Sequence, residues 1–157
     1  MVASSGSRLL LPDAVGALVA RLFPLAAVVS PNLPEAQALT GMDTQDREAL
    51  TERLVAMGAA AALVTGGHGA EPVDHLFDGR QHMPIPVPRH AVAATHGAGC
   101  THSAALAAGL AAGLPLRAAA VAAATVAGAA VAHGLSGLGR GDGPVHVLHH
   151  AGAYRSD

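Results

Sequence analysis

The stretch Thr95-His96-Gly97-Ala98-Gly99-Cys100-Thr101 is a glycine-rich turn that runs directly into an alanine-rich helical segment, residues 103–108. Small residues at positions 97–99 allow the backbone to approach a ligand closely. The first turn of a helix has N–H groups without partners and carries the positive end of the helix dipole. The pattern therefore predicts a helix N-terminus that binds an anion, and phosphate is the most obvious candidate.

The single cysteine of the chain, Cys100, stands at the opening of that helix. The helix dipole favours a thiolate at this place, and a thiolate can act as a base or a nucleophile. Two simpler interpretations stay open on the residues alone. Many glycine-rich turns only give a helix a flexible entry, and a lone cysteine is often a small buried apolar residue.

The composition favours one folded domain over residues 1–157, because 51% of the residues are hydrophobic and the length allows a sizeable core. The net charge of −2, with scattered basic residues, gives no electrostatic case for nucleic acid or an anionic membrane as partner, so small molecules are expected. With one cysteine and no recognisable export signal, we expect a cytoplasmic protein. The uncharged run 118–139 is mostly alanine and is predicted to be a buried helix rather than a membrane span.

Helical and strand-like apolar patterns alternate along the chain. Helices are expected at Leu11–Leu22, Pro34–Thr40 and Thr44–Met57, from the glycine-rich turn to about Leu110, and, after a break at Gly113-Leu114-Pro115, on to about His133. Strands are expected at Ala26–Val29, Ala60–Thr65, Val73–Phe77 and Gln81–Val87, with a further one at Val145–Leu148. Asp78-Gly79 is the clearest hairpin signal. The alternation predicts an α/β fold with a mostly parallel sheet covered by helices.

The beginning of the chain is unusual for such a fold. Met1-Val2-Ala3 is apolar and strand-like, yet no earlier element precedes it. An α/β sheet usually opens with a complete strand, loop and helix. We therefore expect the N-terminal part of the domain to be missing.

Two further loops are expected beside the glycine-rich turn, at the carboxyl ends of strands where ligands gather in open α/β sheets. Asn32 and Glu35 lie three residues apart at the start of a helix, so their oxygen atoms can face one point and hold a hydrated Mg²⁺. The same pair also fits a capping box that only closes the helix N-terminus, and the residues alone favour that simpler role. Thr65-Gly66-Gly67 could bring backbone against a phosphate or could be a tight turn after a strand.

Four motifs in this order resemble the hydroxymethylpyrimidine and phosphomethylpyrimidine kinases of thiamine biosynthesis, within the ribokinase-like superfamily. They are Pro-Asn-x-x-Glu-Ala at 31–36, Gly-Gly-His at 66–68, the block at 95–101, and Gly-Arg-Gly-Asp-Gly-Pro-Val-His at 139–146. Cysteine at position 100, where the superfamily usually has aspartate, makes the resemblance quite specific. It covers nearly the whole chain but only the C-terminal part of such a kinase, which implies a ribokinase-like fold with its N-terminal part missing.

The resemblance implies ATP-dependent phosphorylation of 4-amino-5-hydroxymethyl-2-methylpyrimidine and then of its monophosphate, with Mg²⁺. The family's anion hole corresponds to the backbone of Gly97, Ala98, Gly99 and Cys100, and Cys100 takes the place of the catalytic base. Asn32 and Glu35 match the element that acts on Mg²⁺ and phosphates. The nucleotide phosphates would also be contacted at Thr65, Gly66, Gly67 and Arg140.

Two residues depart from the family pattern. Thr65 stands where a lysine is common, so one positive charge is missing, and Arg140 replaces a common lysine with a different reach and geometry. The family's pyrimidine pocket belongs mainly to the missing part. The alternatives are a pyridoxine or pyridoxal kinase and a non-catalytic remnant that retains nucleotide binding, and a homo-oligomer is a possible assembly. The ten histidines offer no compact ligand set for zinc.

Overall fold

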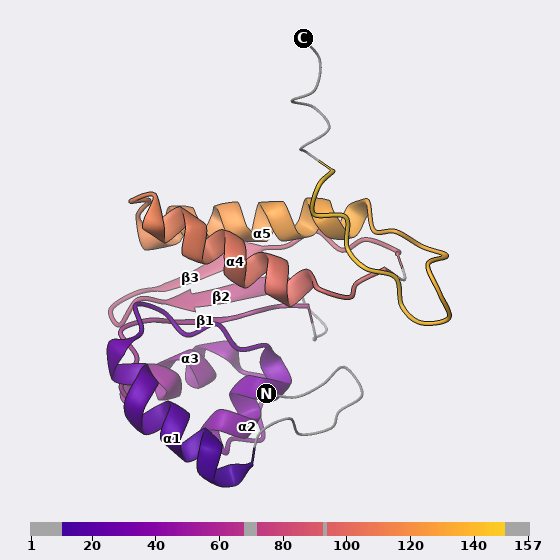
Figure 1. The fold of residues 1–157 in the computed structure, drawn as a ribbon. Coiled ribbons are helices and arrows are strands. Elements are labelled where there is room, and N and C mark those ends of the chain that lie inside the picture. Colours follow the sequence, from indigo (N-terminus) through magenta and orange to yellow (C-terminus); the bar gives the residue numbers. More distant parts are fainter. Residues whose placement is uncertain (1–10, 68–71, 93, 150–157) are drawn as a thin grey trace. The chain divides into compact units, whose positions relative to one another are not determined.

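The computed structural model of the protein describes residues 11–67, 72–92 and 94–149 (Figure 1). The chain divides into two compact units, Met1–Pro86 and Val87–Asp157, and each is described by itself. The strand end expected at Met1-Val2-Ala3 lies outside the described residues, and the single domain over residues 1–157 stays a prediction.

The first unit contains three α-helices, a short 3₁₀ helix and three strands. In chain order they are α1 (Pro12–Leu22), η1 (Phe23–Leu25), α2 (Leu33–Thr40), α3 (Arg47–Ala56), β1 (Ala62–Val64), β2 (Val73–Phe77) and β3 (His82–Pro86). The helices begin and end at local signals. Asp46 caps α3 by accepting hydrogen bonds from the amides of Glu48 and Ala49, and α2 ends at Gly41, whose φ of 69° is left-handed.

The three strands form one sheet in the order β1-β2-β3, and both pairs are antiparallel. The prediction of a mostly parallel sheet was wrong for these strands. Asp78-Gly79 closes a tight hairpin between β2 and β3, and the link between β1 and β2 is too short for the crossover that a parallel pair needs. Parallel pairing occurs as isolated bridges, Val29 with Ala62 and Asn32 with Thr65 in this unit.

Helix α3 packs on β1 and β2, and Figure 1 shows α1, α2 and α3 gathered on one face of the sheet. The core between them contains large apolar side chains that are fully or almost fully buried: Phe23, Leu33, Leu50, Leu54 and Val64. Strand β3 pairs with the edge of β2 opposite to β1 and is the last strand of the sheet. It includes two prolines, Pro84 and Pro86, which pair with His75 and Val73.

The second unit is built on two helices, α4 (Ala98–Ala111) and α5 (Leu116–Ala132), which pack side by side (Figure 1). Small residues meet at one point of this contact. A Cβ atom on Gly109 of α4 would lie 3.2 Å from the Cβ of Ala119 of α5, so the two backbones approach closely. The buried residues of α5 are almost all alanines: Ala119, Ala120, Ala123, Ala124, Ala127 and Ala130, with Gly128.

Two predicted strands did not form. Within Ala26–Val29 only Val29 pairs, through its single bridge to Ala62, and η1 occupies the residues just before Ala26. At the other end, Pro144 forms a bridge with His96, after which the chain turns at residues 147–149 instead of continuing as a strand. Over the described residues, no helix combines the length and apolar character needed to cross a membrane.

Candidate functional site

The N-terminus of α2 is closed by a complete capping box formed by Asn32 and Glu35. The Glu35 amide donates to Asn32 Oδ1 at 2.9 Å, and the Asn32 amide donates to Glu35 Oε2 at 3.1 Å. Both side chains are half-buried. The simpler of the two roles expected for this pair is therefore present, and it holds the two oxygen-bearing groups together at a helix N-terminus.

The same helix start lies beside the turn that follows β1. The Thr65 amide donates to the carbonyl of Pro31 at 3.0 Å, and Asn32 and Thr65 form a parallel bridge. Two of the three predicted loops, the one at Asn32–Glu35 and the one at Thr65-Gly66-Gly67, are thus adjacent within the first unit. His68, the last residue of the Gly-Gly-His motif, lies outside the described residues.

Gly66 packs directly on β2. A Cβ atom at this position would lie 2.5 Å from the carbonyl carbon of Val73, which real Cβ atoms do not tolerate. The Gly66 amide donates to Asp74 Oδ1 at 2.6 Å. Gly66 is buried and its amide is already used, whereas Gly67 is exposed with open space around its α-carbon, so Gly67 is the better-placed backbone contact for a ligand.

The donor set at the α2 N-terminus suits a hydrated Mg²⁺ better than a fully coordinated metal. Asn32 and Glu35 contribute amide and carboxylate oxygens, and each of these oxygens has more than one lone pair although it accepts a backbone N–H. Mg²⁺ is usually held by one or two protein oxygens together with waters and substrate phosphates. No cluster of three or more His, Cys, Asp or Glu side chains able to hold a metal occurs among the described residues.

In the second unit, the predicted anion turn begins α4. Gly97 is the N-cap residue and has a left-handed φ of 89°. Because glycine has no side chain, it cannot cap α4 with a side-chain hydrogen bond. The Ala98 amide donates to the Thr95 carbonyl at 3.1 Å. In the described part of the chain, the amides of Gly99 and Cys100 have no carbonyl partner, as the first turn of a helix requires. The donors for an anion at this turn therefore include the amides of Gly99 and Cys100.

Cys100 is the third residue of α4, and its side chain is exposed. Just before the turn, the His96 amide donates to Gly143 and the Val145 amide donates to His96, which ties the turn to the segment after α5. Arg140 lies in that segment, three residues before Gly143, and its side chain is exposed. The structure thus assembles the predicted residues as two groups: Asn32, Glu35, Thr65, Gly66 and Gly67 in the first unit, and Gly97, Ala98, Gly99 and Cys100 in the second, with Arg140 on the connected segment.

The first unit also contains a cavity of about 280 Å³ that reaches Glu35. Its walls are mostly apolar side chains of α1, η1, α2 and the segment between η1 and α2, and they include Leu18, Phe23, Val29 and Leu39. No basic residue lines it, so it offers nothing that would favour an anionic phosphate. The apolar lining of this cavity therefore sets it apart from the turn at Gly66, which is predicted to contact phosphate.

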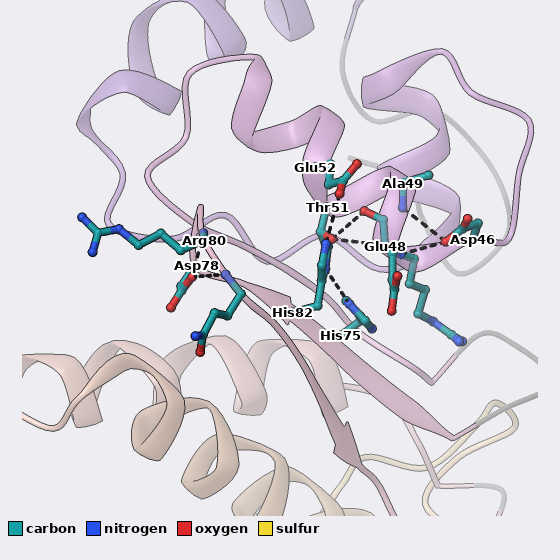
Figure 2. Close-up of polar contacts among 11 residues, drawn as sticks. Asp46, Glu48, Ala49, Thr51, Glu52, His75, Asp78, Arg80 and His82 are labelled. Carbon is teal, nitrogen blue, oxygen red and sulfur yellow. Dashed lines mark hydrogen bonds and ion pairs between the residues drawn. The ribbon is translucent and has the colours of Figure 1, made fainter.

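A second polar cluster joins α3 to the hairpin, as Figure 2 shows. His82 Nδ1 lies 3.0 Å from His75 Nε2, and His82 Nε2 lies 3.1 Å from Glu52 Oε1. A neutral pair of histidines satisfies both contacts when His75 donates to His82 and His82 donates to Glu52. Burial is the main cause that lowers the pKa of His75, and the neighbouring His82 acts in the same direction, against Glu48 and Asp46, which raise it.

Sequence reasoning missed the role of Asp74. The signal was present, because an acidic residue interrupts the apolar strand pattern Val-Asp-His-Leu-Phe at positions 73–77. Its partner, Gly66, is eight residues away in the chain and could not be identified from periodicity alone.

Comparison with known proteins identifies the family. Residues 1–146 match the phosphomethylpyrimidine kinase family. The hydroxymethylpyrimidine/phosphomethylpyrimidine kinase of Rhizobium meliloti is 47% identical over 156 residues, which cover 95% of this chain and 59% of the relative. The enzyme of the same name from Bacillus subtilis is 40% identical, with 93% of this chain and 56% of the relative covered.

Solved structures of related kinases have the same fold. An ADP complex of Bacillus subtilis pyridoxal kinase superposes with a TM-score of 0.84 and 35% identity, covering 91% of this chain and 58% of that one. A phosphomethylpyrimidine kinase from Clostridium difficile superposes with a TM-score of 0.66 and 29% identity, covering 80% of this chain and 52% of that one. The chain thus spans little more than half the length of these proteins, its fold is ribokinase-like as expected, and it belongs to the phosphomethylpyrimidine kinase family.

Proposed function

We propose that this chain supplies the nucleotide and phosphate-handling part of a kinase that transfers the γ-phosphoryl group of ATP to 4-amino-5-hydroxymethyl-2-methylpyrimidine and then to its monophosphate. The observation that carries the proposal is the start of α4. Gly97 adopts a left-handed conformation there, no side chain caps the helix, and the exposed Cys100 follows at its third position. Such a helix N-terminus suits a phosphoryl group that is being transferred.

The candidate residues of each unit have separate roles in this proposal. The amides of Gly99 and Cys100 stabilise the charge that develops on the transferred phosphoryl group, where one well-aimed donor typically contributes about 3 kcal/mol. Gly67 offers backbone to the nucleotide phosphates, and Arg140 adds a positive charge. Asn32 and Glu35 would hold Mg²⁺, which when bound neutralises charge on the phosphate oxygens.

Cys100 acts as the base in the first phosphorylation. A thiolate at this position can accept the proton of the pyrimidine's hydroxymethyl group as its oxygen attacks phosphorus. In the second phosphorylation the acceptor is a phosphate that is already ionised at neutral pH, so it needs little help from a base.

Cys100→Ala should therefore slow the first phosphorylation by about 100-fold, the lower range for loss of a general base, and slow the second much less. The two steps are measured separately, with the alcohol and with the monophosphate as acceptor. Ala104→Ser, an exposed change one turn further along α4, is the matched control and should leave both steps unchanged. Equal losses in the two steps would contradict the assignment of Cys100 as a base.

Nucleotide binding tests the proposal most directly. Saturating Mg·ATP should raise the melting temperature, because a ligand at a hundred times its dissociation constant stabilises the folded state by about 2.7 kcal/mol. The absence of any shift with ATP or ADP would show that the family's phosphate motifs are inherited here without function.

A pyridoxal kinase activity is the second candidate. It is favoured by one observation, the higher TM-score to pyridoxal kinase, 0.84, than to the Clostridium difficile phosphomethylpyrimidine kinase, 0.66. The sequence comparison favours the pyrimidine instead, with 47% identity to the Rhizobium meliloti enzyme. Competition between the pyrimidine alcohol and pyridoxal for the same ATP-dependent turnover separates the two, while binding of ATP without turnover of either acceptor would identify a non-catalytic nucleotide-binding remnant.

A further inference from the structure

Asp74 is the one carboxylate that is buried among the described residues, with only 3% of its surface exposed. It lies in the middle strand of the sheet, where its backbone pairs with Ile85. A buried charge is unfavourable unless hydrogen bonds compensate for the lost water. The bond from the Gly66 amide, 2.6 Å long, contributes to that compensation and joins β2 to the turn after β1.

The turn at Gly66 is thereby held from two sides. On one side, Thr65 donates to the Pro31 carbonyl and pairs with Asn32, which fixes the turn to the start of α2. On the other side, Asp74 holds the Gly66 amide, and the Gly66 α-carbon lies against the backbone of Val73. Losing the hydrogen bond to Asp74 would free the turn to move relative to the capping box of Asn32 and Glu35.

We propose that Asp74 is a positioning residue for the nucleotide phosphates: its carboxylate fixes the Gly66–Gly67 turn beside Asn32 and Glu35 without itself touching the ligand. This inference rests on the proposed function, since it takes the turn to be a phosphate contact. It assigns Gly66 and Gly67 different tasks. Gly66 gives its amide to Asp74, and Gly67 presents backbone to the ligand.

The opposite end of β2 provides a matched control. Asp78 also accepts backbone hydrogen bonds in a turn, from the amides of Arg80 and Gln81, both at 2.8 Å (Figure 2). That turn contains none of the candidate site residues. Losing a carboxylate at Asp78 therefore perturbs the same strand and hairpin without touching the phosphate turn.

The experiment compares Asp74→Ala, Asp74→Asn and Asp78→Ala with the unchanged chain, using the dissociation constant of Mg·ADP measured by calorimetry. Asp74→Ala should weaken ADP binding about tenfold or more, as expected when a buried amide loses its partner. Asp74→Asn keeps an oxygen acceptor and should recover most of the affinity. Asp78→Ala should bind ADP like the unchanged chain.

Hydrogen exchange of the Gly66 amide is the second measurement and does not depend on the nucleotide. It should be slow in the unchanged chain and in Asp78→Ala, and at least about tenfold faster in Asp74→Ala, because loss of the buried acceptor opens the turn. If Asp74→Ala folds and binds ADP as tightly as the unchanged chain, the inference is overturned. If Asp74→Ala does not fold, the same two measurements on Asp74→Asn decide. The inference is also overturned if both variants lose affinity for ADP while the exchange rate of the Gly66 amide stays unchanged.

Failure of the proposed function gives a different pattern. The unchanged chain would then not bind Mg·ADP at all, and exchange of the Gly66 amide would decide whether Asp74 fixes the turn. Unaltered exchange in Asp74→Ala would overturn the inference in that case as well.

Discussion

The two units of this chain are stabilised in different ways. The first has a core of large side chains such as Leu50, Leu54 and Val64, and side chains cap α2 and α3. In the second, the buried residues of α5 are nearly all alanines, and neither α4 nor α5 has a side-chain cap. Alanine buries little apolar area, so the second unit depends on close approach of two helix backbones rather than on side-chain volume. Opposite kinds of mutation should therefore damage the two units.

The largest effect is expected from shortening a side chain in the core of the first unit. Leu54→Ala removes a fully buried side chain and should lower the free energy of unfolding by about 2–5 kcal/mol, through lost burial and the cavity left behind. Guanidinium denaturation measures it. Leu25→Ala, at a position that is 82% exposed, is the control and should change little, and a similar small loss at Leu54 would mean that this core is not tightly packed.

The second unit should instead be sensitive to added volume. Ala123 is fully buried on α5, and Ala123→Leu should lower the free energy of unfolding by about 1–3 kcal/mol because a buried position has no space for the added atoms. Val121→Leu, on the same helix but 44% exposed, serves as the control in the same denaturation experiment. An unchanged free energy of unfolding for Ala123→Leu would show that this buried position has room for a larger side chain and would remove the contrast with the first unit.

Helix capping offers a smaller and more local test of the same contrast. Asp46→Ala removes two hydrogen bonds to the first turn of α3 and should cost about 1 kcal/mol, whereas Asp46→Asn, which retains a capping oxygen, should cost much less. Asp43→Ala, an exposed change three residues earlier, controls for the lost charge. If both alanine variants lose the same stability, charge and not capping is responsible.

The smallest effect is a pH dependence that arises from His75 in the first unit. The pKa of His75 is lowered by its burial and by His82, so the unfolded chain binds this proton at a higher pH than the folded chain. The stabilisation is complete above the ordinary histidine pKa of about 6.5 and is lost as the pH falls through the lower folded value, with a slope below about 1.4 kcal/mol per pH unit.

Denaturation at pH 7, 6 and 5 tests this dependence. His75→Gln should flatten the curve of unfolding free energy against pH, while the exposed change His90→Gln in the second unit should leave it unaltered. A curve for His75→Gln that still falls as steeply as that of the unchanged chain would rule out His75 as the source.

Local signals in the sequence predicted much of the fold. Asp78-Gly79 identified the hairpin, and the helices α1 and α2 were placed to within one residue because Pro12 and Gly41 mark helix ends by their own backbone preferences. The pairing of Val29 was harder to predict. Strand formation depends on a partner far along the chain, and here β1 offers only isolated parallel bridges to the segment around Val29.

The local conformations in the candidate site were predicted where they depend only on residues that are close in the sequence. Asn32 and Glu35 are three apart and form the capping box that their spacing allows, and Gly97 adopts the left-handed conformation that favours glycine. The use of the Gly66 amide by Asp74 required knowledge of how β2 lies against the turn. Whether these residues act on phosphates stays a prediction for the binding experiments above.

Strand β3 has a consequence for the solubility of the chain. Alternate residues of a strand direct their amide nitrogens to the same side, so Pro84 and Pro86 together remove two donors from one side of the last strand in the sheet. A strand lacking those donors is a poor template for extended segments of other molecules. The two prolines thus make the β3 edge of this small sheet a poor site for aggregation by strand addition.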